Sequence, residues 1–412
     1  MKIGILTYFR LANYGANLQA YSTFRFLKNN GHEVLFIDWS PEDYYKSKVE
    51  SAMKDKYKIH HFSFVDETLP ISKRCLNEKD ICQIIKEECI DGVIVGSDAV
   101  TQNHPFLERL SFPSRRVVSI SPKFSTTTFP SPFWGSFIQS LDKKLPIAIM
   151  SGSSQDSKYY YIFGKERRQM KESIEKLSYI SVRDAWTQKM IRYLTRGKIV
   201  PEITPDPVFA LKVNASDTIP SKAEVLQKYN LPEKYVLFSF WNNSIVSYDW
   251  LKEIGDLFQR EGTTPVAFPM PGGVNFNHPF SIEVNTPTPL DWYAIIANAS
   301  AYIGEKMHPI VTCLANAVPC FNFDHCGVKL FKGLFRYSRS SKIYHIMNEF
   351  DVGENRINGS GVFFKPPRPE LVYDKIKNFD INLCSQKAEL YLARYNEMMT
   401  TIIETFKKEI NG

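Results

Sequence analysis

The chain has 412 residues, enough for two or three domains of about 150 residues each. Its hydrophobic share of 43% and charged share of 23% are those of a folded globular protein and argue against a disordered chain. The formal net charge of +7 is mild, and no run of Lys or Arg marks a nucleic-acid or membrane-binding patch. This charge fits either a basic surface that aids solubility or the attraction of an anionic substrate.

The cysteine pattern argues against both a disulfide framework and a metal site, because the seven cysteines are odd in number and include no CxxC pair. Cys75, Cys82 and Cys89 recur every seven residues, which predicts that they share one face of a helix. On one helix their Cα atoms would be about 10 Å apart, too far for a disulfide. We interpret all three as small apolar core residues in a reducing compartment.

The start of the chain does not have the pattern of a signal segment. Residues 3–9 form a short apolar run that Arg10 and Asn13 interrupt. No stretch of about 18 apolar residues suggests a transmembrane helix. We therefore expect a soluble protein of the cytoplasm.

The first residues read as a βαβ unit. Residues 2–8 predict a buried strand, residues 18–27 a helix that Gly31 ends, and residues 33–38 a second strand parallel to the first. The alternation then continues to about residue 208, and it predicts a doubly wound α/β sheet. Its further elements are strands at residues 92–98, 146–150 and 179–182 and helices at residues 81–89, 165–177 and 185–194.

A polar stretch with Pro220 and Pro232 separates this half from a second α/β series. That series has strands at residues 235–240, 265–269, 301–304 and 318–322 and helices at residues 250–259, 291–298 and 308–317. Residues 386–410 carry their apolar side chains on one helical face, which predicts a helix that packs back on the body; a coiled coil is less favoured because the heptads are few.

We therefore divide the chain into two Rossmann-like domains that face each other across a cleft. The N-terminal domain spans residues 1–213, the linker 214–234, the C-terminal domain 235–380, and a C-terminal helix 381–412. Neither a Walker phosphate loop nor a GxGxxG motif is present, which weakens a dinucleotide-binding interpretation.

Candidate site residues follow the predicted strands, because ligands bind beyond the carboxyl ends of the strands in open α/β sheets. In the first half these positions hold Asn13, Tyr14, Gly15, Ser97, Asp98 and Arg183; in the second half they hold Gly272, Gly273, Lys306 and His308. Two such edges that face each other predict a site between the domains.

His308 is the strongest candidate for acid–base chemistry. It is predicted at the start of a helix, where the helix dipole disfavours the imidazolium and lowers the pKa; the alternative is a structural histidine. Arg183 suits a carboxylate or phosphate, or else pairs with Asp184. Lys306 suits a phosphate as a point charge.

Each remaining candidate also has a structural interpretation, which is the favoured one for Gly272 and Gly273. Asp98 fits sugar hydroxyls or a base role, or else caps a helix. Asn13 and Gly15 approach a ligand or form a plain strand-to-helix turn. Gly272 and Gly273 form a phosphate-binding nest or an ordinary turn. Asp206, between two prolines, is interpreted as structural.

Several of these segments together resemble one family. Residues 4–7 with 13–20, then 95–98, 181–184, 205–207, and Lys306-Met307-His308 followed by 315–319, resemble in order the segments of the polysaccharide pyruvyl transferases. Three positions depart from that pattern: Lys306 stands where the family has arginine, Val100-Thr101 where an aromatic follows the turn, and Gly152-Ser153 where other small residues end the strand.

The resemblance implies a fold similar to the two-domain GT-B glycosyltransferases and a ketal-forming reaction on a surface glycan such as an exopolysaccharide. It implies phosphoenolpyruvate as the donor, a free sugar or a lipid-linked oligosaccharide as the acceptor, and neither a metal nor a nucleotide cofactor. Arg183 and Lys306 would hold the donor, His308 would protonate its methylene carbon, and Asp98 with residues 13–15 would face the acceptor.

Two other functions stay open. One is a GT-B-type glycosyltransferase that uses a nucleotide sugar bound near Gly272, Gly273 and Glu305. The other is a non-catalytic glycan-binding member of the family, suggested by the altered Lys306. A peripheral association with membrane-bound glycan-assembly machinery, without a nucleic-acid partner, is compatible with each.

Overall fold

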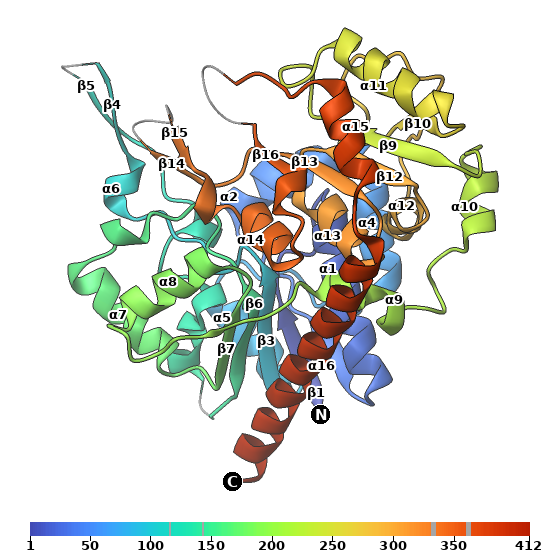
Figure 1. The fold of residues 1–412 in the computed structure, drawn as a ribbon. Helices are drawn as coiled ribbons and strands as arrows, with labels where there is room; N and C mark the ends of the chain where they lie inside the picture. The colour runs from blue at the N-terminus through green and yellow to red at the C-terminus, as the bar shows by residue number, and fades with distance from the viewer. Residues whose placement is uncertain (115–116, 142–143, 331–334, 360–363) are drawn as a thin grey trace.

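The computed structural model describes residues 1–114, 117–141, 144–330, 335–359 and 364–412. It contains two six-stranded parallel sheets flanked by helices (Figure 1). The first has the order β2-β1-β3-β6-β7-β8, with β1 Lys2–Leu6, β2 Glu33–Phe36, β3 Gly92–Asp98, β6 Ile147–Gly152, β7 Tyr179–Val182 and β8 Glu202–Ile203. The second has the order β11-β10-β9-β12-β13-β16, with β9 Tyr235–Ser239, β10 Thr264–Ala267, β11 Ile282–Glu283, β12 Ala301–Gly304, β13 Cys320–Asp324 and β16 Arg356–Asn358.

Both sheets are doubly wound, which confirms the predicted α/β class. The central strands β3, β6 and β9 are buried along nearly their whole length, as expected for parallel strands covered on both faces. The longer helices between the strands are α1 Tyr14–Asn29, α4 Ile59–Thr68, α5 Glu78–Glu87, α7 Gly164–Ile174, α8 Ala185–Leu194, α11 Tyr248–Arg260, α12 Pro289–Ala297, α13 Met307–Ala315, α14 Lys342–Glu349 and α15 Pro369–Lys377. None of the described helices combines the length and the hydrophobicity that crossing a lipid bilayer requires.

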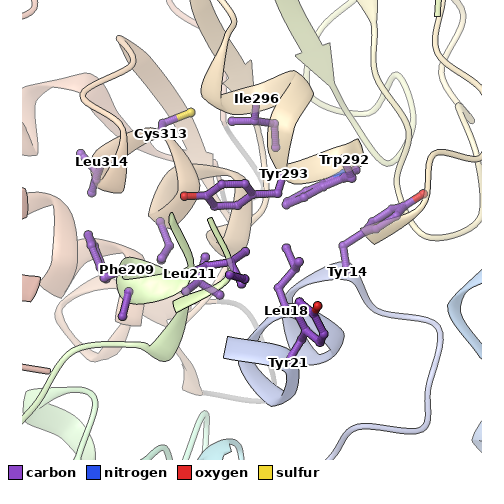
Figure 2. Close-up of a cluster of buried hydrophobic side chains, with 14 of the residues drawn as sticks. Tyr14, Leu18, Tyr21, Phe209, Leu211, Trp292, Tyr293, Ile296, Cys313 and Leu314 are labelled. Carbon is purple, nitrogen blue, oxygen red and sulfur yellow. The ribbon is translucent and has the colours of Figure 1, made fainter. Parts of the chain in front are cut away.

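One hydrophobic core joins the two halves. Figure 2 shows helix α1 facing helix α12, with Tyr14 and Leu18 on one side and Trp292 and Tyr293 on the other. The rings of Tyr14 and Trp292 are stacked, with centroids 4.9 Å apart and an angle of 9° between their planes. The two sheets therefore share buried apolar surface rather than being joined by the linker alone.

Helix α16, Ile381–Asn411, is the predicted C-terminal helix, and it packs on both halves (Figure 1). Near its start the thiol of Cys384 donates to the carbonyl of Leu314, at 3.6 Å. Further along, the Sδ atom of Met398 accepts from the hydroxyls of Ser151 and Ser181 in the first sheet. The prediction that this helix packs back on the body is confirmed.

The predicted linker contains a short helix that was not predicted, α10 Lys222–Lys228, which begins with a reciprocal capping box of Ser221 and Glu224. One local prediction needs correction. The three cysteines spaced by seven do not share a helix: Cys75 precedes α5 and is buried, Cys82 is half-buried, and Cys89 follows the helix and is exposed. Asn77 and Asp80 form a capping box that begins α5 after Cys75, so the regular spacing was not helical. All seven cysteines of the chain are free thiols.

Candidate functional site

A cleft of about 1130 Å³ lies where the carboxyl ends of the two sheets meet. The loops after β1, β3 and β6 line one side, and those after β9, β10 and β12 line the other. Seven of the ten predicted site residues line this cleft: Asn13, Tyr14, Gly15, Asp98, Gly272, Lys306 and His308. The other three, Ser97, Arg183 and Gly273, do not.

His308, the second residue of α13, packs directly over Gly15 at the start of α1. A Cβ atom on Gly15 would lie 1.9 Å from His308 Cγ, so only glycine leaves room for the ring. Glycine is thus required at residue 15 because a side chain from the other half packs directly against its backbone. It had been predicted only as a turn residue or a backbone contact to a ligand.

The His308 imidazole faces a buried carboxylate. Its Nε2 atom lies 4.0 Å from Asp206 Oδ2 and has no hydrogen-bond partner among the described residues. Burial lowers the pKa of His308 to about 4, and the negative charge of Asp206 opposes that shift. The direction agrees with the prediction, but the main cause is burial. The imidazole is therefore neutral at neutral pH.

Arg183 holds two carboxylates behind the wall of the cleft. Its Nη1 donates to Asp206 Oδ2 at 2.6 Å, and its Nη2 lies 3.5 Å from Asp98 Oδ1. Its side chain is only 3% exposed. Burial is the largest influence and would raise the pKa of Asp206, but the charges of Arg183 and His308 together with hydrogen bonds from Val208 and Arg183 leave that pKa below its usual value.

Both interpretations of Arg183 need correction. The guanidinium does not face the cleft, so the expected direct contact with the donor is not available to it as it lies. It does not pair with Asp184 either, because Asp184 caps α8 through the amide of Thr187 and accepts from Ser153. Asp206, interpreted as structural, is instead the residue that links Arg183 to His308.

Asp98 reaches the cleft from an unusual backbone conformation. Its φ of 85° lies in the left-handed region, which aspartate tolerates better than most residues. The preceding Ser97 is buried, and its hydroxyl donates to the carbonyl of Ser151 at 3.0 Å. Ser97 therefore holds the strand ends together and lies outside the lining of the cleft.

The Gly272-Gly273 segment is a turn, not a nest of free amides. The amide of Gly273 donates to the carbonyl of Met270 at 2.9 Å, and the ring of Tyr57 covers Gly273. Only Gly272 lines the cleft. On the opposite side, the side chain of Asn13 caps α1 by accepting from the amide of Ala16.

Four lysines line the cleft: Lys48, Lys58, Lys306 and Lys342. Lys58 pairs with Asp55 at 2.7 Å, whereas no ion pair holds the other three among the residues that the structure describes. The ammonium of Lys306 lies 5.1 Å from the centroid of the Trp241 ring. The cleft thus offers several free cations, which suits an anionic ligand.

Lys342 was missed in the sequence. It is the first residue of α14, and it also lines a small cavity beneath the cleft beside Arg183 and Asp206. Burial, and then the charge of Arg183, lower the pKa of its ammonium. The sequence did contain a signal for this helix: Ser341, a typical N-cap residue, directly precedes Lys342. No element had been predicted in that region.

Comparisons with known proteins agree with this geometry. The chain resembles the UDP-GlcNAc 2-epimerase of Methanocaldococcus jannaschii, with a TM-score of 0.52 and 11% identity over 93% of each chain. It also resembles that of Neisseria meningitidis bound to UDP-GlcNAc, with a TM-score of 0.52 and 10% identity over 99% of this chain and 100% of the other. At such identities the likeness concerns the fold alone, and it confirms the expected GT-B-like arrangement.

The comparison with curated proteins finds no match. A family model, polysaccharide pyruvyl transferase, matches residues 13–327, which include all ten predicted site residues. The chain belongs to the polysaccharide pyruvyl transferase family.

Proposed function

We propose that the protein transfers the pyruvyl group of phosphoenolpyruvate to two hydroxyls of a glycan sugar, forming a ketal and releasing phosphate. The observation that carries the proposal is the buried, neutral His308 beside Asp98 in a cleft with three lysines free of ion pairs. The donor carries a carboxylate and a phosphate, so it needs several cations and one group that moves a proton.

The reaction balances with these residues. One sugar hydroxyl adds to C2 of the donor while its methylene carbon takes a proton and becomes a methyl group. The second hydroxyl then forms the other C–O bond at C2 as the bond from C2 to the phosphate oxygen breaks. The two hydroxyl protons end on the methyl group and on the phosphate.

His308 is placed to move those protons. A bound phosphate would favour the imidazolium and raise the pKa of His308 from its value of about 4. Lys306 and Lys342 would hold the donor anion, with Lys342 in the role first expected of Arg183. Arg183 then positions Asp206 beside His308 and Asp98 toward the acceptor.

The test is turnover of phosphoenolpyruvate with a panel of free and lipid-linked glycans. Phosphate release and the ketal methyl signal in NMR spectra report the reaction. We expect His308→Ala to lower kcat by about 10²- to 10⁴-fold and Lys342→Ala mainly to raise KM for the donor. Lys252→Ala, at an exposed position of helix α11, should have no effect. Absence of phosphate release from the folded protein with every acceptor would refute the proposal.

A nucleotide-sugar donor is the second candidate. It is supported by the fold shared with a UDP-GlcNAc-bound epimerase and by Trp241, which is 53% exposed at the cleft and offers a stacking surface. Thermal stabilisation by UDP-sugars but not by phosphoenolpyruvate would favour it. If His308→Ala left cellular glycan assembly unchanged, a non-catalytic role would replace both.

We also place the reaction in the cytoplasm, since seven free cysteines are typical of a reducing compartment.

A further inference from the structure

An exposed apolar surface lies on one side of the first half, away from the centre of the cleft. It comprises seven large side chains that are 38% to 61% exposed: Phe106 and Leu107 of helix α6 Phe106–Arg109, Val118 and Ile120 of strand β5 Val117–Ile120, Tyr160 and Tyr161 of the 3₁₀ turn Tyr159–Tyr161, and Phe163 before α7. Scattered exposed apolar residues are ordinary, but a contiguous group marks an interaction site.

The group is contiguous because three chain segments are joined at this point. Strand β4 Leu110–Ser114 follows α6 directly, and it pairs with β5 so that Leu110 lies opposite Ile120. The amide of Lys158 donates to Glu108 at 3.3 Å, which ties the 3₁₀ turn to α6. Figure 1 shows the β4–β5 hairpin projecting from the body with α6 at its base.

Strand β5 of the hairpin exposes Val118 and Ile120 on one face. Val118 and Ile120 are two residues apart on a strand, so their side chains point to the same side. An exposed strand of this kind tends to pair or aggregate unless something covers it. We therefore expect a partner to cover this exposed strand.

Cations surround the apolar group. Lys123, Lys165 and Arg168 are exposed and have no carboxylate partner within the described part of the chain, and Arg109 and Lys158 belong to or adjoin the segments that carry the apolar group. The nearby acids are already engaged: Glu108 lies within 4.0 Å of Lys158 Nζ, and Glu166 accepts from Asn103. No run of basic residues was visible in the sequence because these cations come from separate segments.

This surface also adjoins the cleft. A hollow of about 290 Å³, lined by residues that include Arg109, Ser121 and Lys158, shares Phe124 and Thr127 with the lining of the main cleft. A ligand held at the apolar surface would thus lie at one entrance to the site.

We propose that this surface, hereafter the aromatic–basic surface, docks the protein on an anionic lipid bilayer. Tyr and Phe side chains suit the headgroup region, and Lys and Arg are attracted by anionic lipids. A protein partner is the weaker match, because the cores of protein interfaces are depleted in lysine and charge. Docking would present the cleft to a lipid-linked acceptor; only that last step rests on the proposed function.

The test is cosedimentation of the full chain with vesicles of phosphatidylglycerol and phosphatidylethanolamine, and separately of phosphatidylcholine. We expect binding to the anionic vesicles that falls with added salt, and little binding to phosphatidylcholine. Val118→Ser with Ile120→Ser, and separately Lys165→Glu with Arg168→Glu, should each reduce binding at least fivefold. Leu390→Ser, at a 64% exposed position on α16, is the matched control and should leave binding unchanged.

Binding needs no donor or acceptor, so its outcome is independent of the proposed function. Equal binding by the hairpin variant and the Leu390 control, or no binding to anionic vesicles, would overturn the proposal. So would a lipid-free dimer, seen by analytical ultracentrifugation, that the hairpin substitutions abolish, because the surface would then be an interface between two copies of the chain.

Discussion

At the scale of single residues, the contact between Gly15 and His308 is the most sensitive point of the site. Gly15→Ala would put a methyl group 1.9 Å from the present position of His308 Cγ, so the ring must leave its place opposite Asp206. Overpacking of this kind costs about 1–3 kcal/mol of stability. We expect Gly15→Ala to lose turnover by more than its stability loss explains, measured by kcat together with a urea unfolding curve.

Gly31→Ala is an instructive control for this experiment. Unlike Gly15, Gly31 is constrained by its backbone, with a φ of 77°, and no atom lies within 4 Å of its missing Cβ. It should lose stability without losing turnover. If both variants behave alike, the packing argument at Gly15 is wrong.

The pKa of His308 predicts how stability depends on pH. In the folded state it is lowered to about 4, below the value of about 6.5 in an unfolded chain, so the unfolded state binds the proton first. The contribution of His308 to the free energy of unfolding is fully present above about pH 6.5. It declines as the pH falls toward 4, at about 1.4 kcal/mol per pH unit.

The measurement is the difference in unfolding free energy between the wild type and His308→Gln as a function of pH. This difference should be constant above pH 6.5 and shift in favour of the glutamine variant below it. A difference that does not change between pH 7 and 4.5 would contradict a neutral, buried imidazole. His60 and His61 act in the same direction in both proteins, since burial lowers the pKa of each, and they cancel.

The limits of sequence reasoning are clear at this scale. The positions after the strands were predictable, because the sheet topology dictates that they meet. Whether a side chain faces the cleft or lies behind it was not, since that depends on packing from distant segments. Arg183 is buried and pairs with two carboxylates. Lys342 reaches the cleft from a helix that follows His308 by about 35 residues in the sequence.

At the scale of elements, helix α16 packs across the first sheet and stabilises it. The ring of Phe406 lies against the bare backbone of Gly92, where a Cβ atom would be 2.5 Å from the ring. Phe406→Ala removes a fully buried ring and should cost about 3–5 kcal/mol of stability by chemical denaturation. Ile410→Ala, one turn further and 43% exposed, should change stability by less than about 0.5 kcal/mol; similar losses for both would mean that the end of α16 does not pack as described.

The elements themselves were predictable to different degrees. Strands β7 and β12 and helix α8 have the predicted bounds, because buried apolar runs and a helical period are local signals. Asn77 caps α5 so that this helix begins at Glu78, before the predicted start at residue 81, and Ser221 caps α10, a helix that was not predicted. The β4–β5 hairpin was missed because Val118 and Ile120 of β5 are exposed, so the strand lacks the buried apolar run by which the other strands were predicted.

At the scale of the whole molecule, the shared core predicts that the two halves unfold together. Residues of β1, such as Ile3, and of β9, such as Leu237, belong to one continuous buried cluster, and α16 contacts both halves. We therefore expect a single calorimetric transition whose van't Hoff and calorimetric enthalpies agree. Trp292→Ala removes the ring stacked on Tyr14 and should lower the Tm by several degrees, whereas Trp241→Ala, exposed at the cleft, should leave it nearly unchanged. Two separate transitions in the wild type would mean that the core between α1 and α12 is too weak to couple the sheets. The cleft would then open by separation of its two walls rather than by movement of the loops that line it.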